Sequence, residues 1–102
     1  MPRRPAIEVP HDAVEGFCRR NQVRRLSFFG SVLRADFTPE SDVDVLVEFQ
    51  AGHAPGLLGL AAMERELSGI LGRRVDLNTI GFLSRYFADE VLREAQDQYV
   101  AA

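Results

Sequence analysis

The segment from Phe28 to Phe49 constrains the fold most strongly, because Gly30-Ser31 is followed, after ten intervening residues, by Asp42-Val43-Asp44. Residues 43–49 are rich in branched and aromatic side chains, which is typical of a buried strand. Side chains alternate across a strand, so Asp42 and Asp44 are predicted to share one face, roughly 7 Å apart along it. Carboxylates held this close repel each other, and a divalent cation between them removes the repulsion. The pair therefore predicts a metal site.

The Gly30-Ser31 pair predicts a phosphate site beside that metal site. Residues 25–29 form a short predicted strand, and residues 32–36 are expected to coil as a helix. A strand-to-helix turn of this kind presents unpaired backbone N–H groups, and the helix dipole adds positive potential. Glycine lets the backbone approach a ligand closely, and the serine hydroxyl can donate one more hydrogen bond.

Asp76 is the expected third carboxylate. It lies in the strand-like segment Arg74–Asn78, which follows the Asp42/Asp44 strand after a crossover of helical length. If the two strands pair, Asp76 faces the same cleft as the other two carboxylates. Two divalent ions roughly 4 Å apart, held by three carboxylates, form a clamp for in-line displacement at phosphorus.

These residues resemble the signature of the DNA polymerase beta-type nucleotidyltransferase superfamily. The stretches GSVLRADFTPESDVDVLVEF and LGRRVDLNT are similar to its minimal nucleotidyltransferase (MNT) branch, whose members are the antitoxins of HEPN–MNT toxin–antitoxin pairs. The resemblance runs from about Leu26 to the C-terminal helix. It implies a place near the nucleotide for Arg34, through a GS-x-x-R pattern. The residues themselves equally allow an ion pair of Arg34 with Asp36 or Glu40.

The resulting hypothesis is transfer of AMP from ATP. The β and γ phosphates would lie on the Gly30-Ser31 turn, and Asp42 and Asp44 would hold two Mg²⁺ ions across the triphosphate. Asp76 would join the ion that activates the attacking hydroxyl and could accept its proton. The resemblance implies a tyrosine hydroxyl of a partner HEPN ribonuclease toxin as the acceptor, so that the added charge and bulk block RNA entry.

Two other functions fit the same residues. In the first, the chain is a non-catalytic antitoxin that masks its partner sterically. In the second, it is a transferase that acts on RNA ends or small molecules, although we expect no added substrate domain in a chain of 102 residues.

Length and composition predict one domain over residues 1–102, because 46% hydrophobic residues suit a single core. The resemblance implies that this is a minimal nucleotidyltransferase domain. Residues 1–10 contain three prolines and are expected to be an extended lead-in. We expect a cytoplasmic protein, since no signal-peptide pattern and no run of roughly 18 apolar residues is present. Cys18 is the only cysteine, so it cannot form an internal disulfide.

The charge is distributed unevenly along the chain. The first 35 residues carry seven arginines and three acidic residues, whereas the remainder carries five arginines and twelve acidic residues. The arginines at 19, 20, 24 and 25 predict either a basic surface for a partner protein or a solvated helix face. A net charge of −3 argues against a direct nucleic-acid binder.

Hydrophobic periodicity and turn residues predict the order of the elements. A first helix is expected from Ala13 to about Asn21, with Asp12 as its cap, and a long helix from Leu57 to Leu71, ended by Gly72. A last helix is expected from Ser84, as its cap, to about Tyr99. The predicted strands cover residues 23–29, 43–49 and 73–78. The fold class is therefore α/β (α+β two-layer), a small mixed sheet flanked by helices, and the resemblance implies the polymerase beta-type nucleotidyltransferase fold.

Overall fold

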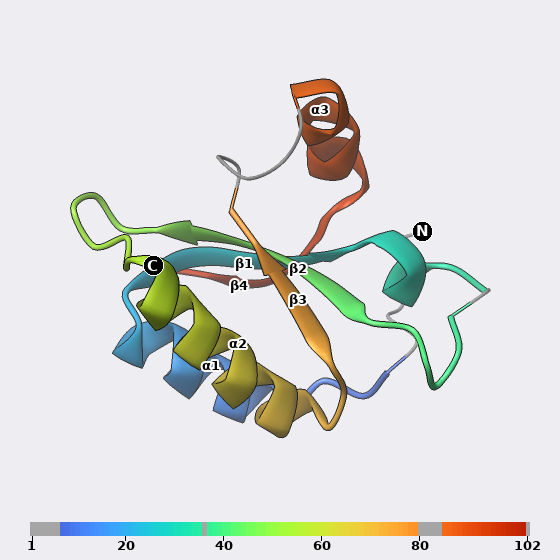
Figure 1. Cartoon of the computed structure of the whole chain (residues 1–102), viewed down its shortest axis with the longest axis horizontal. Helices are drawn as coiled ribbons and strands as arrows, with labels where there is room; N and C mark the ends of the chain where they lie inside the picture. Colours follow the sequence, from blue (N-terminus) through green and yellow to red (C-terminus); the bar gives the residue numbers. More distant parts are fainter. Residues whose placement is uncertain (1–6, 36, 80–84, 102) are drawn as a thin grey trace.

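The computed structural model describes residues 7–35, 37–79 and 85–101. Four strands form one sheet in the order β3-β2-β1-β4 (Figure 1). The central strand β1 runs antiparallel to both β2 and β4, whereas β2 and β3 run parallel. In chain order the elements are α1 His11–Arg20, β1 Val23–Phe29, the 3₁₀ helix η1 Gly30–Leu33, β2 Val43–Phe49, α2 Leu57–Leu71, β3 Val75–Asn78, α3 Arg85–Glu94 and β4 Gln96–Val100. The predicted mixed sheet with flanking helices is confirmed.

Helices α1 and α2 lie side by side against one face of the sheet, and α3 lies on the other side (Figure 1). Alternation along β2 explains this arrangement, because Val43, Val45 and Val47 are all buried and share a face. The apolar sides of the two helices, including Phe17 and Leu67, complete the core on that face. Burial of these large side chains is the main stabilising contribution to the fold.

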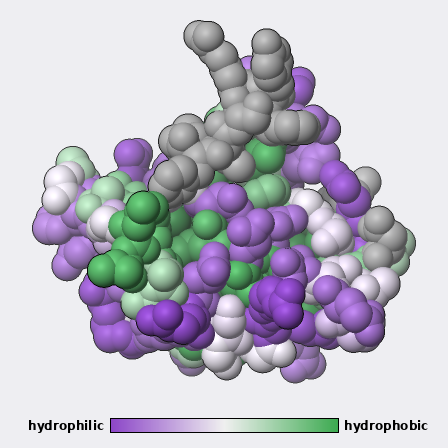
Figure 2. All heavy atoms as spheres, viewed as in Figure 1, coloured by the Kyte–Doolittle hydropathy of each residue, from purple (hydrophilic) through white to green (hydrophobic). Residues whose placement is uncertain are grey.

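Helix α2 begins and ends as the sequence predicts. Gly72 ends it in the left-handed conformation with φ +66°, as expected of a C-terminal glycine. At its first residues, Leu57 and Leu58 are exposed, and Figure 2 shows hydrophobic residues gathered at this end of the helix. None of the helices within the described residues is long and apolar enough to cross a membrane.

The predicted cap of the first helix is wrong. Helix α1 starts at His11, directly after Pro10, and no side chain forms a hydrogen bond to its first turn. Asp12 lies inside that turn, where a negative charge still interacts favourably with the helix dipole. Most of the predicted lead-in, residues 1–6, lies outside the described residues.

The prediction of a last helix up to Tyr99 is also wrong. Helix α3 ends at Glu94, and the chain then forms β4, which pairs with β1. Tyr99 lies opposite Leu26 in this pairing and packs against the core. A pairing partner some seventy residues away in the chain has overridden the local helical periodicity. The predicted cap, Ser84, lies outside the described residues.

Candidate active site

The three aspartates singled out in the sequence lie at one end of the sheet. Asp42 directly precedes β2, Asp44 is the second residue of β2, and Asp76 is the second residue of β3. Asp44 and Asp76 are paired residues of the two parallel strands. The predicted pairing of the Asp76 strand with the Asp44 strand is therefore confirmed, and their side chains share the face opposite α1 and α2.

The carboxylates also interact electrostatically. Burial, followed by the negative charges of Asp76 and Asp42, raises the pKa of Asp44 from 3.8 to about 6. The positive charge of Arg34 acts in the opposite direction and lowers this pKa. Without a cation, the site therefore opposes ionisation of Asp44, because desolvation and like charges both disfavour the carboxylate.

Gly30 allows the end of β1 to approach Asp44. The preceding residue, Phe29, pairs with Asp44 in the sheet. Gly30 has φ +74°, and a β-carbon at this position would overlap Oδ2 of Asp44. A glycine was expected here for close approach to a ligand. The structure shows that it is also required by the neighbouring carboxylate.

The turn after β1 is tighter than predicted. In place of a helix over residues 32–36, a single 3₁₀ turn covers Gly30–Leu33 and includes Ser31. The N–H of Arg34 donates to the carbonyl of Ser31 at 2.9 Å, and Arg34 is already extended. Val32 and Leu33 are both buried, so packing of two adjacent side chains sets the end of this turn.

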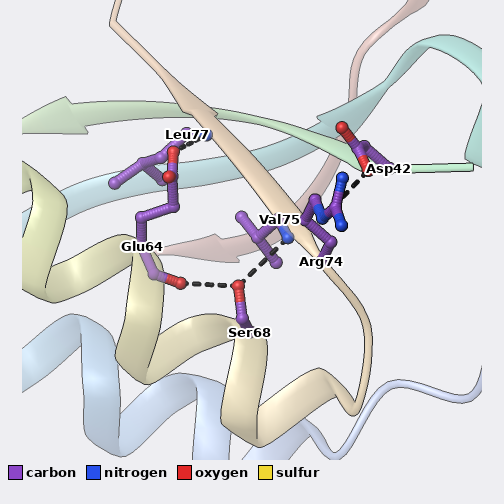
Figure 3. A network of polar contacts seen from close by, with 6 residues as sticks. All are labelled: Asp42, Glu64, Ser68, Arg74, Val75 and Leu77. Carbon is purple, nitrogen blue, oxygen red and sulfur yellow. Dashed lines mark hydrogen bonds and ion pairs between the residues drawn. The ribbon is translucent and has the colours of Figure 1, made fainter.

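Two arginines flank the aspartates. Arg34 forms an ion pair with Glu94 of α3, with Nη2 3.2 Å from Oε2, so the alternative pairing with Glu40 is wrong. The other alternative, Asp36, lies outside the described residues. Arg74, which the sequence reasoning missed, has its Nε 3.9 Å from Oδ1 of Asp42 (Figure 3). The sequence did contain a hint of this role. Arg74 lies two residues before Asp76, so its side chain is expected on the same side of the strand.

A family model described as "Nucleotidyltransferase domain" matches residues 12–100, which include all the residues of the site. The chain belongs to this nucleotidyltransferase family. It is 42% identical over 72 residues to a protein adenylyltransferase, MntA, of Thermococcus cleftensis, a match that covers 71% of each chain.

Solved structures share the fold of this nucleotidyltransferase. A toxin–antitoxin complex with AMP-PNP superposes with a TM-score of 0.74 at 17% identity, covering 91% of this chain and 75% of that one. A complex of a tri-AMPylated HEPN toxin from Shewanella oneidensis with an MNT antitoxin gives a TM-score of 0.65 at 17% identity, covering 89% and 70%. At this level of identity the two neighbours establish the fold alone.

The acidic residues of this nucleotidyltransferase suit a divalent cation by their chemistry. Carboxylate oxygens are the ligands that Mg²⁺ prefers, and the repulsion that raises the Asp44 pKa is what a cation relieves. Within residues 7–35, 37–79 and 85–101, no three acidic, histidine or cysteine side chains already converge on one cation position. Asp42, Asp44 and Asp76 are the candidate residues to hold such an ion.

Proposed function

We propose that this nucleotidyltransferase transfers AMP from ATP, with Mg²⁺, to a hydroxyl group of a partner protein. The proposed acceptor is a tyrosine of a HEPN ribonuclease toxin, so that the chain acts as its antitoxin. The observation that carries the proposal is the direct pairing of Asp44 with Asp76, beside Asp42 and the Gly30 turn. A fold has no stability reason to gather three carboxylates, so we infer that they serve the reaction.

Each residue has a distinct proposed role in binding. The Gly30-Ser31 turn binds the β and γ phosphates through backbone N–H groups and the serine hydroxyl. Arg34, whose charge already acts on Asp44, neutralises part of the phosphate charge. Asp42 and Asp44 hold the cations, which neutralise the triphosphate and lower the pKa of the acceptor hydroxyl when bound.

Asp76 is the proposed base, because it is exposed and lies on the edge strand, where an acceptor can approach it. The acceptor oxygen forms a bond to the α-phosphorus, and the bond from that phosphorus to the β-phosphate bridging oxygen breaks. Pyrophosphate leaves, and the proton of the acceptor hydroxyl passes to the Asp76 carboxylate.

The relatives support the chemistry and the partner class. One relative is named as a protein adenylyltransferase, and one solved neighbour is an AMPylated HEPN toxin bound to an MNT antitoxin.

The test is the intact mass of a HEPN toxin after incubation with the protein, ATP and Mg²⁺. We expect a gain of one or more AMP units with the wild type and none with the double variant Asp42→Asn/Asp44→Asn. A matched control is Asp89→Asn/Glu90→Gln on α3, which removes the same charge from an exposed site and should still modify the toxin. No mass gain with the wild type, together with full neutralisation by the Asp42→Asn/Asp44→Asn variant, would replace the proposal by steric masking.

A further inference from the structure

The strand that carries Asp76 is weakly held by the sheet itself. β3 has four residues, lies at the edge of the sheet and pairs with β2 alone. Its second residue, Asp76, is paired with Asp44 of β2, so two carboxylates lie on neighbouring strands at the same level of the sheet. Parallel pairing is also slightly less stable per residue than antiparallel pairing. Beyond the packing of buried Val75, contacts along the free edge of β3 can therefore help to hold Asp76 beside Asp44.

Side chains of α2 provide these contacts along the free edge of β3. The N–H of Val75 donates to Oγ of Ser68 at 3.0 Å, and the N–H of Leu77 donates to Oε2 of Glu64 at 2.9 Å (Figure 3). These two N–H groups flank Asp76 and point away from β2. They would otherwise form an unpaired edge of the sheet. We call the pair of hydrogen bonds from Val75 and Leu77 to α2 the edge contacts.

The two acceptors are themselves fixed in place. Glu64 and Ser68 lie one helical turn apart, so they share one side of α2. The Ser68 hydroxyl donates to the carbonyl of Glu64 at 2.7 Å, which orients its oxygen toward β3. Between them in sequence, Leu67 is fully buried and anchors the helix to the sheet. The edge contacts thus connect the position of Asp76 to the hydrophobic core.

We propose that Glu64 and Ser68 are positioning residues that keep Asp76 close enough to Asp44 for both carboxylates to bind divalent cations together. This proposal rests on the proposed function, since it assigns the two residues to the same site. Both side chains accept from backbone N–H groups of β3 and not from an aspartate side chain. Both therefore act on Asp76 through the backbone of β3.

The first test compares Glu64→Ala with a matched change on the same helix, Glu66→Ala. Glu66 forms its ion pair with Arg20 and has no hydrogen bond to β3. We expect Glu64→Ala to increase hydrogen exchange of the Leu77 N–H and to weaken Mn²⁺ binding about tenfold, since loss of such supporting residues commonly costs 10 to 100-fold. Glu66→Ala should change neither. Unchanged Mn²⁺ affinity in a folded Glu64→Ala variant would overturn the proposal.

Two further variants separate positioning from a merely structural role. Glu64→Gln keeps a carbonyl oxygen as acceptor, so it should restore most of the Mn²⁺ affinity, whereas equal loss in Gln and Ala variants would contradict the proposal. In an Asp76→Asn background, Glu64→Ala should cause little additional loss, because it acts through Asp76. If Glu64→Ala weakens Mn²⁺ binding as much in the Asp76→Asn background as in the wild type, the result would argue against the proposal. If Glu64→Ala does not fold, Ser68→Ala takes its place, with exchange of the Val75 N–H as the readout.

These measurements remain informative if the proposed function fails. Mn²⁺ binding and hydrogen exchange need neither ATP nor an acceptor protein. A wild type that binds Mn²⁺ but transfers no AMP would reject the proposed transfer and leave the positioning role intact. The opposite result, normal AMP transfer by Glu64→Ala with unchanged Mn²⁺ affinity, would reject the positioning role alone.

Discussion

The two faces of the sheet differ in burial and in the polarity of their side chains. On the face beneath α1 and α2, Val43, Val45 and Val47 are almost completely buried. On the other face the same strand presents Asp44, Leu46 and Glu48, and only Leu46 is buried. We call them the covered face and the open face. One strand thus contributes to the core and to the candidate site through the alternation of its side chains.

This difference indicates that stability and chemistry are largely separable in this protein. The covered face gains its free energy from apolar burial. The open face carries the three aspartates of the candidate site, and one of them, Asp44, is held in its charged form only at a cost, as its raised pKa shows. Changes on the covered face should therefore lower stability, whereas changes at the aspartates should affect the reaction.

The largest expected effect on stability comes from the covered face. Phe28 is fully buried and pairs with Val45. Phe28→Ala should lower the free energy of unfolding by about 3–5 kcal/mol, because it removes a large apolar side chain and leaves a cavity. Urea unfolding measures this change. A loss below about 1 kcal/mol would contradict the assignment of the covered face as the main source of stability.

Gly30→Ala should affect both properties at once, because Gly30 lies where the strand end meets the open face. An alanine would be strained at φ +74° and its β-carbon would displace the Asp44 carboxylate. We expect a loss of about 1–3 kcal/mol in stability and a strong loss of AMP transfer.

Gly52→Ala is the matched control for this change. Gly52 has φ +80°, but a β-carbon there would meet nothing within 4 Å. The Gly52→Ala variant should therefore lose about as much stability through backbone strain as the Gly30→Ala variant loses through strain. It should keep its AMP-transfer activity. Equal activity of the Gly30→Ala and Gly52→Ala variants would show that the close approach to Asp44 has no functional importance.

The third prediction concerns the pH dependence of stability. Native Asp44 keeps its proton up to about pH 6, whereas in the unfolded chain the group loses it near 3.8. Between these values the native state binds more protons, so the contribution of Asp44 to stability falls as pH rises. Above pH 6 the destabilisation is complete, about 1–2 kcal/mol after allowing for solvent screening.

The comparison of wild type with Asp44→Asn isolates this contribution from other titrating groups. Without divalent cations, Asp44→Asn should be the more stable protein at pH 7, and the difference should vanish near pH 4. Adding Mg²⁺ should reduce the difference at pH 7, since a bound cation stabilises the ionised carboxylate. A wild type that is more stable than the variant at pH 7 without cations would mean that Asp44 is not repelled by its neighbours.

The sequence predicts the elements whose signals are local. The alternation in β2, the apolar stripe of α2 and the stop at Gly72 all act within a few residues, and the structure has them at the predicted positions. The parallel pairing that brings Asp76 beside Asp44 was accessible because a strand, a helix and a strand follow one another.

Features that depend on distant partners were not predictable in the same way. Residues Gln96–Val100 form strand β4 because they pair with β1, although their own sequence continues a helical pattern. The partner of Arg34 lies sixty residues away at Glu94, and the edge contacts join Glu64 to Leu77 across a turn. Such contacts depend on side-chain orientation in the folded chain, which periodicity does not determine.

The smallest expected effect tests whether the open face also contributes to stability. Ser27 is the buried polar residue of β1, and its hydroxyl donates to Oδ1 of Asp97 in β4 at 2.6 Å. Ser27→Ala should lower the free energy of unfolding by about 1 kcal/mol, because half-exposed Asp97 recovers hydration and keeps Arg25 nearby. Hydrogen exchange of the β4 amides should rise more than that of β2. A loss as large as that of Phe28→Ala would show that this face stabilises the fold too, and the separation of the two faces would not hold.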